Sequence, residues 1–399
     1  MLTTGRAPSQ VTPTSVIALG SGLASADGGS GLSALSGTGL RLSIGLGASS
    51  AERAPDQPGG SRESYGTEEL AIVLSHYDVG PIQAIQEFRR GSRRSPKLII
   101  SGLKGVFLLK RRAPGRDDLA RVLLAHGVQR HLAARGFPVP RLIERIDGGE
   151  TLLRHGGRIY ELFEFIPGTR YDASLPATAE SGRALALFHK IIADHQPSDR
   201  RLSPSYHEAP GMAEQLRLIA ARDPGSPELG PTCRALGDLY AKAAAKAQSA
   251  GLGRWPAQIV HGDWHPGNTL YRGQKVVAVI DFDSVRHEAR ALDVANGALQ
   301  FSITMSGADL AQWPAHLDDS RFKRFCRGYD SVEGCLLSTA ELQAMPWLMI
   351  EALIVEAVAP IAATGMFAGY PGEDFLRMVR RKVEWMAREA PRLADLVSG

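Results

Sequence analysis

The chain has 399 residues, of which 44% are hydrophobic and 22% are charged, with a formal net charge of +4. A chain of this length can bury a large core and is expected to form more than one lobe. The small net charge is spread along the sequence, which argues against a nucleic-acid-binding tail and against a basic membrane-binding block.

The cysteines and the apolar segments point to a cytoplasmic protein. No apolar run reaches the ~20 residues of a membrane helix, because the most apolar segment is broken by Glu351, Glu356 and Pro360. A weakly apolar run at residues 16–26 is interrupted by Gly and Ser, so we do not interpret it as a signal peptide. Three cysteines lack metal-binding spacing and are expected to be buried thiols in a reducing compartment. They are Cys233, Cys326 and Cys335.

Residues 1–66 are rich in Gly, Ser, Ala and Thr and contain few aromatic residues. Such a composition cannot bury enough apolar surface to offset the entropy of ordering, so we expect a disordered, low-complexity tail. A start codon placed too far upstream would produce the same composition. The sequence leaves these two interpretations open.

Residues 67–163 predict a small N-lobe made of an antiparallel sheet and helices. Strands are expected at 82–88, 97–100, 105–110 and 158–166, and helices at 68–76 and 117–135. The turn at 90–96 carries Gly91 and Ser92 beside three arginines, and its backbone amides and cations could cover a nucleotide's phosphates. An ordinary basic hairpin turn would have the same composition.

The strand at 105–110 ends in Lys110, where lysines of the V-A-I-K type reach the α and β phosphates of ATP. Alternation along a strand places Lys110 on the same face as Leu108, whereas Arg111 points the opposite way. We therefore expect Lys110 to be the functional cation. A solvated lysine at a strand end is the alternative.

Residues 164–399 predict a mainly helical C-lobe. Helices are expected at 179–192, 212–222, 231–250, 289–305, 320–329, 339–364 and 374–388. Between the lobes, the strand at 158–166 runs into Pro167 and Gly168, which suits a linker whose backbone near Phe163, Glu164 and Phe165 would bind an adenine ring.

The most informative stretch is H-G-D-W-H-P-G-N at residues 261–268, followed by I-D-F-D at 280–283. The spacing places Asp263 and Asn268 at the two ends of a tight loop. Residues 269–280 read as a hairpin around the turn at 273–275, which would return Asp281 to the side of Asn268. The two side chains could then share one divalent cation.

The same stretch has a rival interpretation as a zinc site, since His261 and His265 are four residues apart. Pro266 and Gly267 disfavour the helix that would bring the two rings together. There is also no glutamate in an H-E-x-x-H arrangement, so we favour phosphoryl transfer.

These motifs resemble the aminoglycoside phosphotransferase and homoserine or choline kinase-like superfamily over residues 68–387. Spore-coat CotS-like features occur at 108–112 and 132–140. The resemblance implies an α+β, bilobal protein-kinase-like fold and a small-molecule kinase that uses ATP and Mg²⁺. It also implies that Asp263 is the catalytic base, that Asn268 and Asp281 are Mg²⁺ ligands, and that Lys110 contacts the ATP phosphates.

The expected helix at 117–135 departs from that pattern. Many relatives carry a glutamate there to orient the lysine, but the middle of this helix offers Arg121, His126, Gln129 and Arg130. Either Gln129 or His126 replaces the glutamate by hydrogen bonding, or the lysine is oriented in another way. The alternative function is therefore a catalytically weak kinase-fold protein that binds a nucleotide or acts as a scaffold.

The acceptor is expected to be a small hydroxylated molecule, such as an amino alcohol, a sugar or an aminoglycoside, because no long activation loop and no A-P-E tripeptide follow Ser284. Four carboxylates could face a cationic acceptor, although exposed helix carboxylates are more common. They are Glu288, Asp309, Glu351 and Glu356. Asp293 and His189 are expected to have supporting roles, and Asp283 either contacts metal-bound water or is a solvated or capping carboxylate. The oligomeric state stays open.

Overall fold

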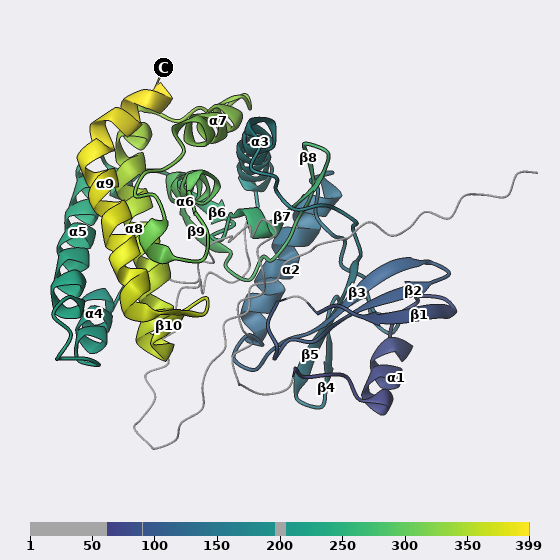
Figure 1. Cartoon of the computed structure of the whole chain (residues 1–399). Coiled ribbons are helices and arrows are strands. Elements are labelled where there is room, and N and C mark those ends of the chain that lie inside the picture. Colours follow the sequence, from purple (N-terminus) through teal and green to yellow (C-terminus); the bar gives the residue numbers. More distant parts are fainter. Residues whose placement is uncertain (1–61, 90, 196–204, 399) are drawn as a thin grey trace, which may run out of the picture.

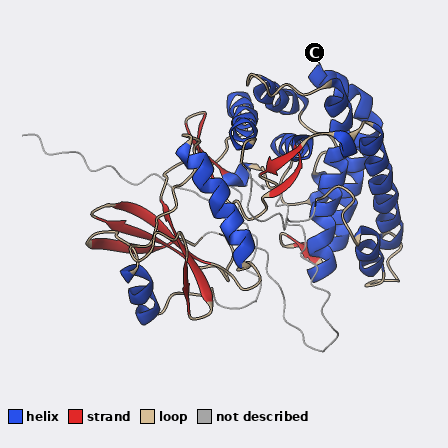
Figure 2. Cartoon of the chain, turned by 180° about the vertical axis from the view of Figure 1, so that it is seen from behind, coloured by secondary structure: helices blue, strands red, loops and turns tan. Residues whose placement is uncertain are grey.

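The computed structural model describes residues 62–89, 91–195 and 205–398 and has two lobes (Figure 1). Strands β1 to β5 with helices α1 and α2 form the small lobe, helices α3 to α9 form the large one, and α2 lies on the side of the small lobe that faces the large one. Seen from behind, the long strands gather in the small lobe, and only short strands lie among the helices of the large lobe (Figure 2). The expected α+β, bilobal kinase-like fold is confirmed.

The N-lobe is built on a five-stranded sheet in the order β1-β2-β3-β5-β4, in which every neighbouring pair is antiparallel. Its strands are β1 (Ile82–Glu87), β2 (Lys97–Gly102), β3 (Gly105–Arg111), β4 (Leu153–His155) and β5 (Arg158–Glu164). Its helices are α1 (Thr67–Ser75) and α2 (Leu119–Ala134). All the predicted strands and helices of this lobe occur, and the prediction missed only the short β4.

The two faces of this sheet have opposite characters because side chains alternate along each strand. One face packs under α1 and buries Ile100, Leu109 and Leu162 with Val73 of the helix. The opposite face carries a row of three charged residues, Lys97, Lys110 and Glu161, which lie directly opposite one another on β2, β3 and β5. The sheet register therefore gathers charge on the face that looks toward the C-lobe.

Part of the expected tail belongs to the N-lobe. Residues 1–61 lie outside the described part of the chain, but residues 62–66 contact the sheet. The Glu63 carboxylate pairs with Arg111 at 2.8 Å, and the Tyr65 hydroxyl donates to the Pro96 carbonyl at 3.1 Å. These contacts extend the N-lobe to residues before Thr67.

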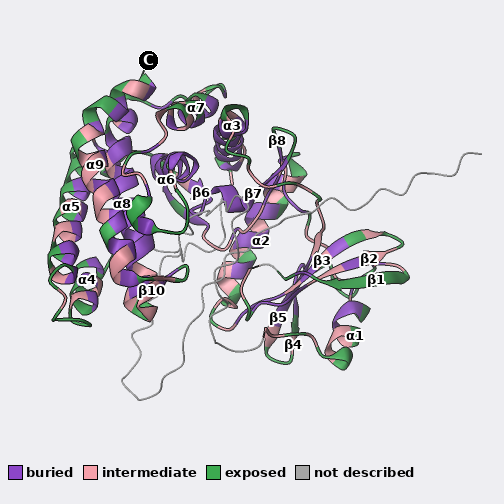
Figure 3. Ribbon diagram, in the orientation of Figure 1, coloured by how far each residue is buried: buried purple, intermediate pink, exposed green. Residues whose placement is uncertain are grey.

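The C-lobe is helical, as predicted. Its helices are α3 (Leu175–Ile192), α4 (Met212–Ala220), α5 (Leu229–Ser249), α6 (Arg290–Ser302), α7 (Asp319–Asp330), α8 (Thr339–Thr364) and α9 (Gly372–Ser398). Figure 3 shows that α6 and much of α8 are buried, whereas the outer helices expose one side. Within the described residues, α8 is the one helix long and apolar enough to cross a membrane, yet most of it is buried inside this lobe.

Two pairs of short strands position the loops between the lobes. β6 (Ala257–Val260) pairs with β9 (Arg286–Ala289), and β7 (Thr269–Arg272) pairs with β8 (Lys275–Val279), both antiparallel. The second pair is the hairpin expected from the sequence. Residues 261–268 leave β6, and residues 280–285 lead into β9, so both loops lie at the same end of the β6–β9 pair.

Helices α3 and α7 cross so closely that each needs a glycine at the contact. A Cβ atom on Gly182 would lie 2.0 Å from the Phe325 carbonyl oxygen, and one on Gly328 would lie 1.9 Å from the Ala179 carbonyl oxygen. Both obstacles are backbone atoms, so the helices would have to separate.

We predict that Gly182→Ala and Gly328→Ala each lower the free energy of unfolding by about 1–3 kcal/mol, the usual cost of overpacking. Gly237→Ala in α5 is the matched control, because its Cβ would meet only Leu216 Cδ1 at an ordinary 3.5 Å. That control should be neutral or gain up to ~1 kcal/mol from reduced unfolded-state entropy. Urea denaturation of the three variants tests the crossing, and equal stability of all three would contradict it.

Candidate active site

The second residue of the loop at 261–268 is a glycine that no other residue could replace without moving the chain. Gly262 has a φ of 75°, and a Cβ on it would lie 2.3 Å from the Ser284 carbonyl oxygen. Gly262 therefore lets this loop approach the loop that carries Asp281. The glycine of the H-G-D motif is explained by this close approach.

Asp293, near the start of α6, fixes the beginning of the same loop. Its fully buried carboxylate accepts the backbone N–H groups of His261 at 2.8 Å and Gly262 at 3.0 Å. It also accepts from His189 Nε2 at 3.1 Å. Burial alone would raise the pKa of Asp293, but the His189 hydrogen bond and the neighbouring histidines hold it below its usual value. The supporting roles expected for Asp293 and His189 are confirmed.

Asp263 and Asn268 lie at the two ends of the loop and contact each other. The Asn268 side-chain nitrogen donates to the Asp263 carboxylate at 3.1 Å and to its backbone carbonyl at 3.0 Å. Burial lowers the pKa of His265 to about 3, so that ring is neutral, and its Nε2 lies 3.7 Å from the Asp263 carboxylate. Residues 266–268 form a 3₁₀ turn rather than an α-helix, which removes the helical face that the zinc interpretation required.

Asp281 arrives beside Asn268 as the hairpin predicted. The Ile280 N–H donates to the Asn268 carbonyl at 3.0 Å, which joins the end of one loop to the start of the other. Asp281 has a φ of 65°, an uncommon conformation for a residue with a side chain and one that is enriched at functional sites. Asn268 Oδ1 is buried and accepts no hydrogen bond within the described residues. A buried amide oxygen next to a carboxylate fits a divalent cation.

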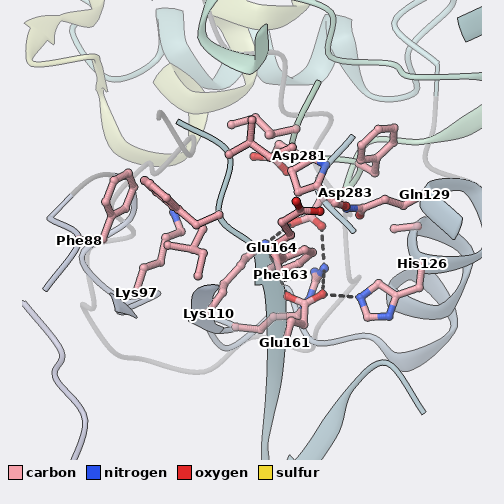
Figure 4. A pocket seen from close by; sticks show the side chains of 18 of the residues that line it. Phe88, Lys97, Lys110, His126, Gln129, Glu161, Phe163, Glu164, Asp281 and Asp283 are labelled. Atoms are coloured by element: carbon pink, nitrogen blue, oxygen red, sulfur yellow. Dashed lines mark hydrogen bonds and ion pairs between the residues drawn. The ribbon is translucent and has the colours of Figure 1, made fainter. Parts of the chain in front are cut away.

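A cleft of about 830 Å³ lies between the lobes at this point. One part of its lining is apolar, and the other part is charged. The apolar part comprises Phe88, Leu108, Ala125, Phe163, Phe165, Ile166, Leu270, Ile280 and Phe282. The charged part comprises Lys97, Lys110, Arg112, Glu161, Asp281 and Asp283. Figure 4 shows five of these charged side chains in the cleft, namely Lys97, Lys110, Glu161, Asp281 and Asp283.

Three cations come from two neighbouring strands and the residue that follows. Lys110 lies in the cleft as predicted, whereas Arg111 lies on the opposite face and pairs with Glu69 at 2.6 Å. Sequence reasoning missed the other two cations, Lys97 and Arg112. Burial, followed by the neighbouring Lys110, lowers the pKa of Lys97 to about 8. The signal that could have found Arg112 is alternation, which places it on the same face as Lys110.

Neither Gln129 nor His126 directly replaces the glutamate that many relatives carry on the helix equivalent to α2. Gln129 donates to the Pro140 carbonyl at 2.5 Å, so it does not serve Lys110. His126 binds Glu161 at 2.6 Å, and the Glu161 Oε2 atom lies 3.7 Å from Lys110 Nζ. The carboxylate beside the lysine therefore comes from strand β5, and His126 contacts it from α2.

Asp283 forms ion pairs with two cations of the cleft, so it is not the freely solvated carboxylate that one interpretation of the sequence expected. Its carboxylate pairs with Arg112 at 2.8 Å and lies 3.6 Å from Lys110 Nζ. Burial alone would raise the pKa of Asp283, but Arg112 and then Lys110 hold it well below its usual value. The I-D-F-D segment thus brings Asp281 beside Asn268 and contributes Asp283 to the cation cluster.

Only some of the residues expected to contact the nucleotide line the cleft or the small cavity beside it. Ser92 lines a small cavity of about 310 Å³ with Lys97, Lys110 and Asp281, but Gly91 does not line that cavity or the main cleft, and Arg90 lies outside the described residues. Glu164 and Phe165 line the cleft. Their backbone N–H groups already donate to the Arg141 and Val106 carbonyls, at 2.8 and 2.9 Å.

Of the four acidic residues considered for the acceptor, Glu356 is influenced by the charge of Asp263, whereas the other three have interactions of their own. Glu288 pairs with Arg286 at 2.8 Å, Glu351 binds His207 at 2.8 Å, and Asp309 caps a short helix. Glu356 is buried on α8 and accepts from Gln300 of α6 at 2.7 Å. Burial, together with the Asp263 carboxylate, raises the pKa of Glu356 well above its usual value.

A family model described as the phosphotransferase enzyme family matches residues 85–335, which include both loops and the cleft. The chain belongs to the phosphotransferase enzyme family. It is a small-molecule kinase with an alcohol group as acceptor. The family assignment agrees with the resemblance seen in the two motifs.

Several relatives share most of this member's length. A homoserine kinase of Xanthobacter autotrophicus is 27% identical over 287 residues, which cover 70% of this chain and 80% of the relative. An aminoglycoside phosphotransferase from Alicyclobacillus acidocaldarius has a similar structure, with a TM-score of 0.58, 18% identity, and coverage of 88% of this chain and 98% of that one. A microcompartment-associated aminopropanol kinase has a TM-score of 0.60 at 16% identity, over 82% of this chain and 98% of that one. At these identities, the structural matches show the fold.

We predict that Asp293→Ala destabilises this phosphotransferase by roughly 2–4 kcal/mol, because it leaves two buried backbone N–H groups and His189 without their acceptor. Asp293→Asn is the control, since its amide oxygen can still accept one of these bonds and the loss should be smaller. Thermal and urea denaturation measure the difference. A wild-type melting temperature in Asp293→Ala would show that the carboxylate does not hold the loop.

Proposed function

We propose that this protein transfers the γ-phosphoryl group of ATP to a hydroxyl group of a small, amine-bearing acceptor, with Asp263 as the catalytic base. The observation that supports it most directly is the meeting of two loops beside a cation-lined cleft. Asp281 lines the cleft, Asn268 Oδ1 is buried without a hydrogen-bond partner among the described residues, and the Asp263 carboxylate accepts from the Asn268 amide. The cytoplasm, which supplies ATP, is the compartment this function implies.

Each group has a defined task in the proposed reaction. The adenine ring would lie against the apolar part of the cleft. Its polar edge would meet the N–H of Ile166, since those of Glu164 and Phe165 are occupied. Lys97 and Lys110 would contact the phosphates, with Ser92 near them. Gly91, whose φ is 82°, would shape the turn above them.

Asp263 would accept the proton of the acceptor hydroxyl while holding its oxygen in line with the γ-phosphorus. The Asn268 amide fixes the orientation of the Asp263 carboxylate by donating to it. Asn268 Oδ1 and the Asp281 carboxylate would hold Mg²⁺, which supplies charge neutralisation on the transferring phosphoryl group. Positioning and electrostatics thus provide the catalysis.

The preference for an amine follows from the charge around Asp263. Glu356 is buried and ionisable, and the described side chains that influence its pKa most are Asp263 and Gln300, neither of which is a cation. Its Oε1 atom has no hydrogen-bond partner among the described residues, and neither polar side-chain atom of Asn296, one turn before Gln300, has one. An acceptor that brings an ammonium group would supply the missing charge and donors.

The names of the relatives agree with such an acceptor. Homoserine and aminopropanol, which appear in the names of two similar proteins, each carry a hydroxyl group and an amine. A first panel would include both, together with 1,2-propanediol as an acceptor without an amine. Acceptor-dependent ADP release by the wild-type protein is the readout. No release with any acceptor would favour the catalytically weak nucleotide-binding alternative.

We predict that Asp263→Ala lowers kcat by about 10²–10⁴-fold, the usual contribution of a general base, and leaves Mg·ATP affinity nearly unchanged. Asp281→Ala should lose both turnover and the Mg²⁺-dependent part of ATP binding. Thermal-shift titration with ATP, with and without Mg²⁺, separates the two variants. Asp147→Asn, which removes an exposed carboxylate of the N-lobe, is the control. Equal activity of Asp263→Ala and wild type would overturn the assignment of the base.

We predict that Glu356→Gln raises KM for amine-bearing acceptors by about 10–100-fold, the equivalent of a hydrogen bond to a charged group, and leaves KM for 1,2-propanediol unchanged. Because the pKa of Glu356 is raised, its carboxyl group is protonated at lower pH and binds an ammonium less well. Wild-type KM for the amine should therefore fall as pH rises through that pKa, and Glu356→Gln should abolish this dependence.

Glu351→Gln is the matched control for that prediction, since Glu351 is also buried on α8 but pairs with His207. It should keep both the wild-type KM and its pH dependence. Asp263 is proposed to act in the chemical step, so its substitution would change kcat rather than KM for the acceptor, and the two carboxylates are distinguishable. An equal effect of Glu356→Gln on acceptors with and without an amine would refute the charge argument.

A further inference from the structure

The carboxylate beside Lys110 belongs to Glu161 of strand β5 and not to a residue of helix α2. The sixteen residues of α2 include no Asp or Glu, whereas Glu161 lies directly opposite Lys110 in the β3–β5 register and is fully buried. We propose that Glu161, held by His126 and Arg112, is the positioning residue that orients Lys110 toward the nucleotide phosphates. This inference rests on the proposed function and adds a residue to it.

The two oxygens of Glu161 have different surroundings. Oε1 accepts from His126 Nε2 at 2.6 Å and from Arg112 Nη2 at 2.8 Å. Oε2 is buried, has no hydrogen-bond partner within the described residues, and lies 3.7 Å from Lys110 Nζ. One oxygen is thus fixed by two donors, and the other is left for the lysine. A shift of less than 1 Å would complete an ordinary charge-assisted hydrogen bond.

His126 is itself fixed in the tautomer that this role requires. Its Nδ1 atom lies 2.7 Å from the Thr151 hydroxyl. Because an ionised carboxylate only accepts, Nε2 carries the proton that binds Glu161, and in the neutral ring Nδ1 then accepts from the Thr151 hydroxyl. Burial alone would raise the pKa of Glu161, but Arg112, followed by Lys110 and His126, holds it well below its usual value. Glu161 is therefore ionised at neutral pH.

Placement on a strand makes the pair permanent. In protein kinases the glutamate is carried by a helix, and movement of that helix assembles or separates the pair. Here, backbone pairing between β3 and β5 fixes the spacing of Lys110 and Glu161. Arg112 also binds Asp283, two residues after Asp281, and so joins Glu161 to the metal loop. The lysine is positioned without any adjustment of α2.

The first test compares Glu161→Gln with the wild-type protein in Mg·ATP affinity and in KM for ATP. Glutamine preserves the shape of the side chain and removes its charge. We expect ATP affinity and kcat/KM for ATP to fall by about 10–100-fold. Glu69→Gln is the matched control, because Glu69 pairs with Arg111 on the opposite face of the same sheet. It should leave both quantities unchanged.

A coupling test and a rescue test distinguish positioning from general stabilisation. If Glu161 acts through Lys110, the double variant Lys110→Ala with Glu161→Gln should be no weaker than Lys110→Ala alone. His126→Glu combined with Glu161→Gln moves the carboxylate to α2, because His126 Nε2 already lies 2.6 Å from Glu161 Oε1. We expect this double variant to recover ATP affinity at least threefold relative to Glu161→Gln.

Several outcomes would overturn the inference. These are an ATP affinity of Glu161→Gln within twofold of wild type, additive losses with Lys110→Ala, or a rescue variant weaker than Glu161→Gln. Should Glu161→Gln fail to fold, His126→Phe removes one donor and keeps the Glu161 carboxylate, because phenylalanine has no polar side-chain atom. An unchanged ATP affinity of that variant would then contradict the proposal. Failure of the proposed function would look different, because wild type would bind ATP without acceptor-dependent ADP release.

Discussion

The antiparallel pairing of β6 and β9, with Val260 opposite Arg286, brings the two chemical loops together. The loop that starts at His261 leaves the end of β6, and the loop that carries Asp281 enters β9 from the same end. Only Gly262 permits the final approach, since a Cβ there would meet the Ser284 carbonyl. The buried Asp293 carboxylate then accepts the first two N–H groups of the loop. The positions of Asp263 and Asn268 depend on this arrangement.

The charged row of the N-lobe is a second consequence of strand register. Burying an ion is costly unless partners compensate for the lost water. Lys97, Lys110 and Arg112 are compensated in part by Glu161 and Asp283, which lie among them. Asp281 lines the same cleft. An incoming polyanion would find cations already desolvated and held by the sheet, so little reorganisation is needed for it to bind.

How much of this could be read from the sequence depends on how local each feature is. Strand alternation correctly predicted that Lys110 and Arg111 lie on opposite faces of the sheet. The hairpin at 269–280 correctly predicted that Asp281 lies beside Asn268. Both predictions depend only on residues close together in the sequence. Glu161 was missed because it lies 51 positions after Lys110, and only the register of β5 against β3 brings the two together. The sequence prediction considered only residues of α2 as replacements for the helix glutamate. In the structure, His126 of α2 is a hydrogen-bond partner of the Glu161 carboxylate and does not replace it.

The acceptor residues show a different limit. Glu351 and Glu356 lie on the same helix and are both buried, but α8 is apolar on nearly all sides, so no apolar stripe indicates which face looks toward Asp263. The packing of α8 against α6 determines which way the Glu356 side chain points, since Gln300 of α6 donates a hydrogen bond to its carboxylate.

The two halves of the site therefore have separate origins. The proposed nucleotide end is built from strands whose register is fixed by backbone bonds, and the proposed acceptor end from side chains on two packed helices. If these proposals hold, substitutions on α6 or α8 would change which acceptor is bound without moving Lys110, Glu161 or Asp281. A fold divided in this way can keep one phosphoryl donor while its acceptor changes.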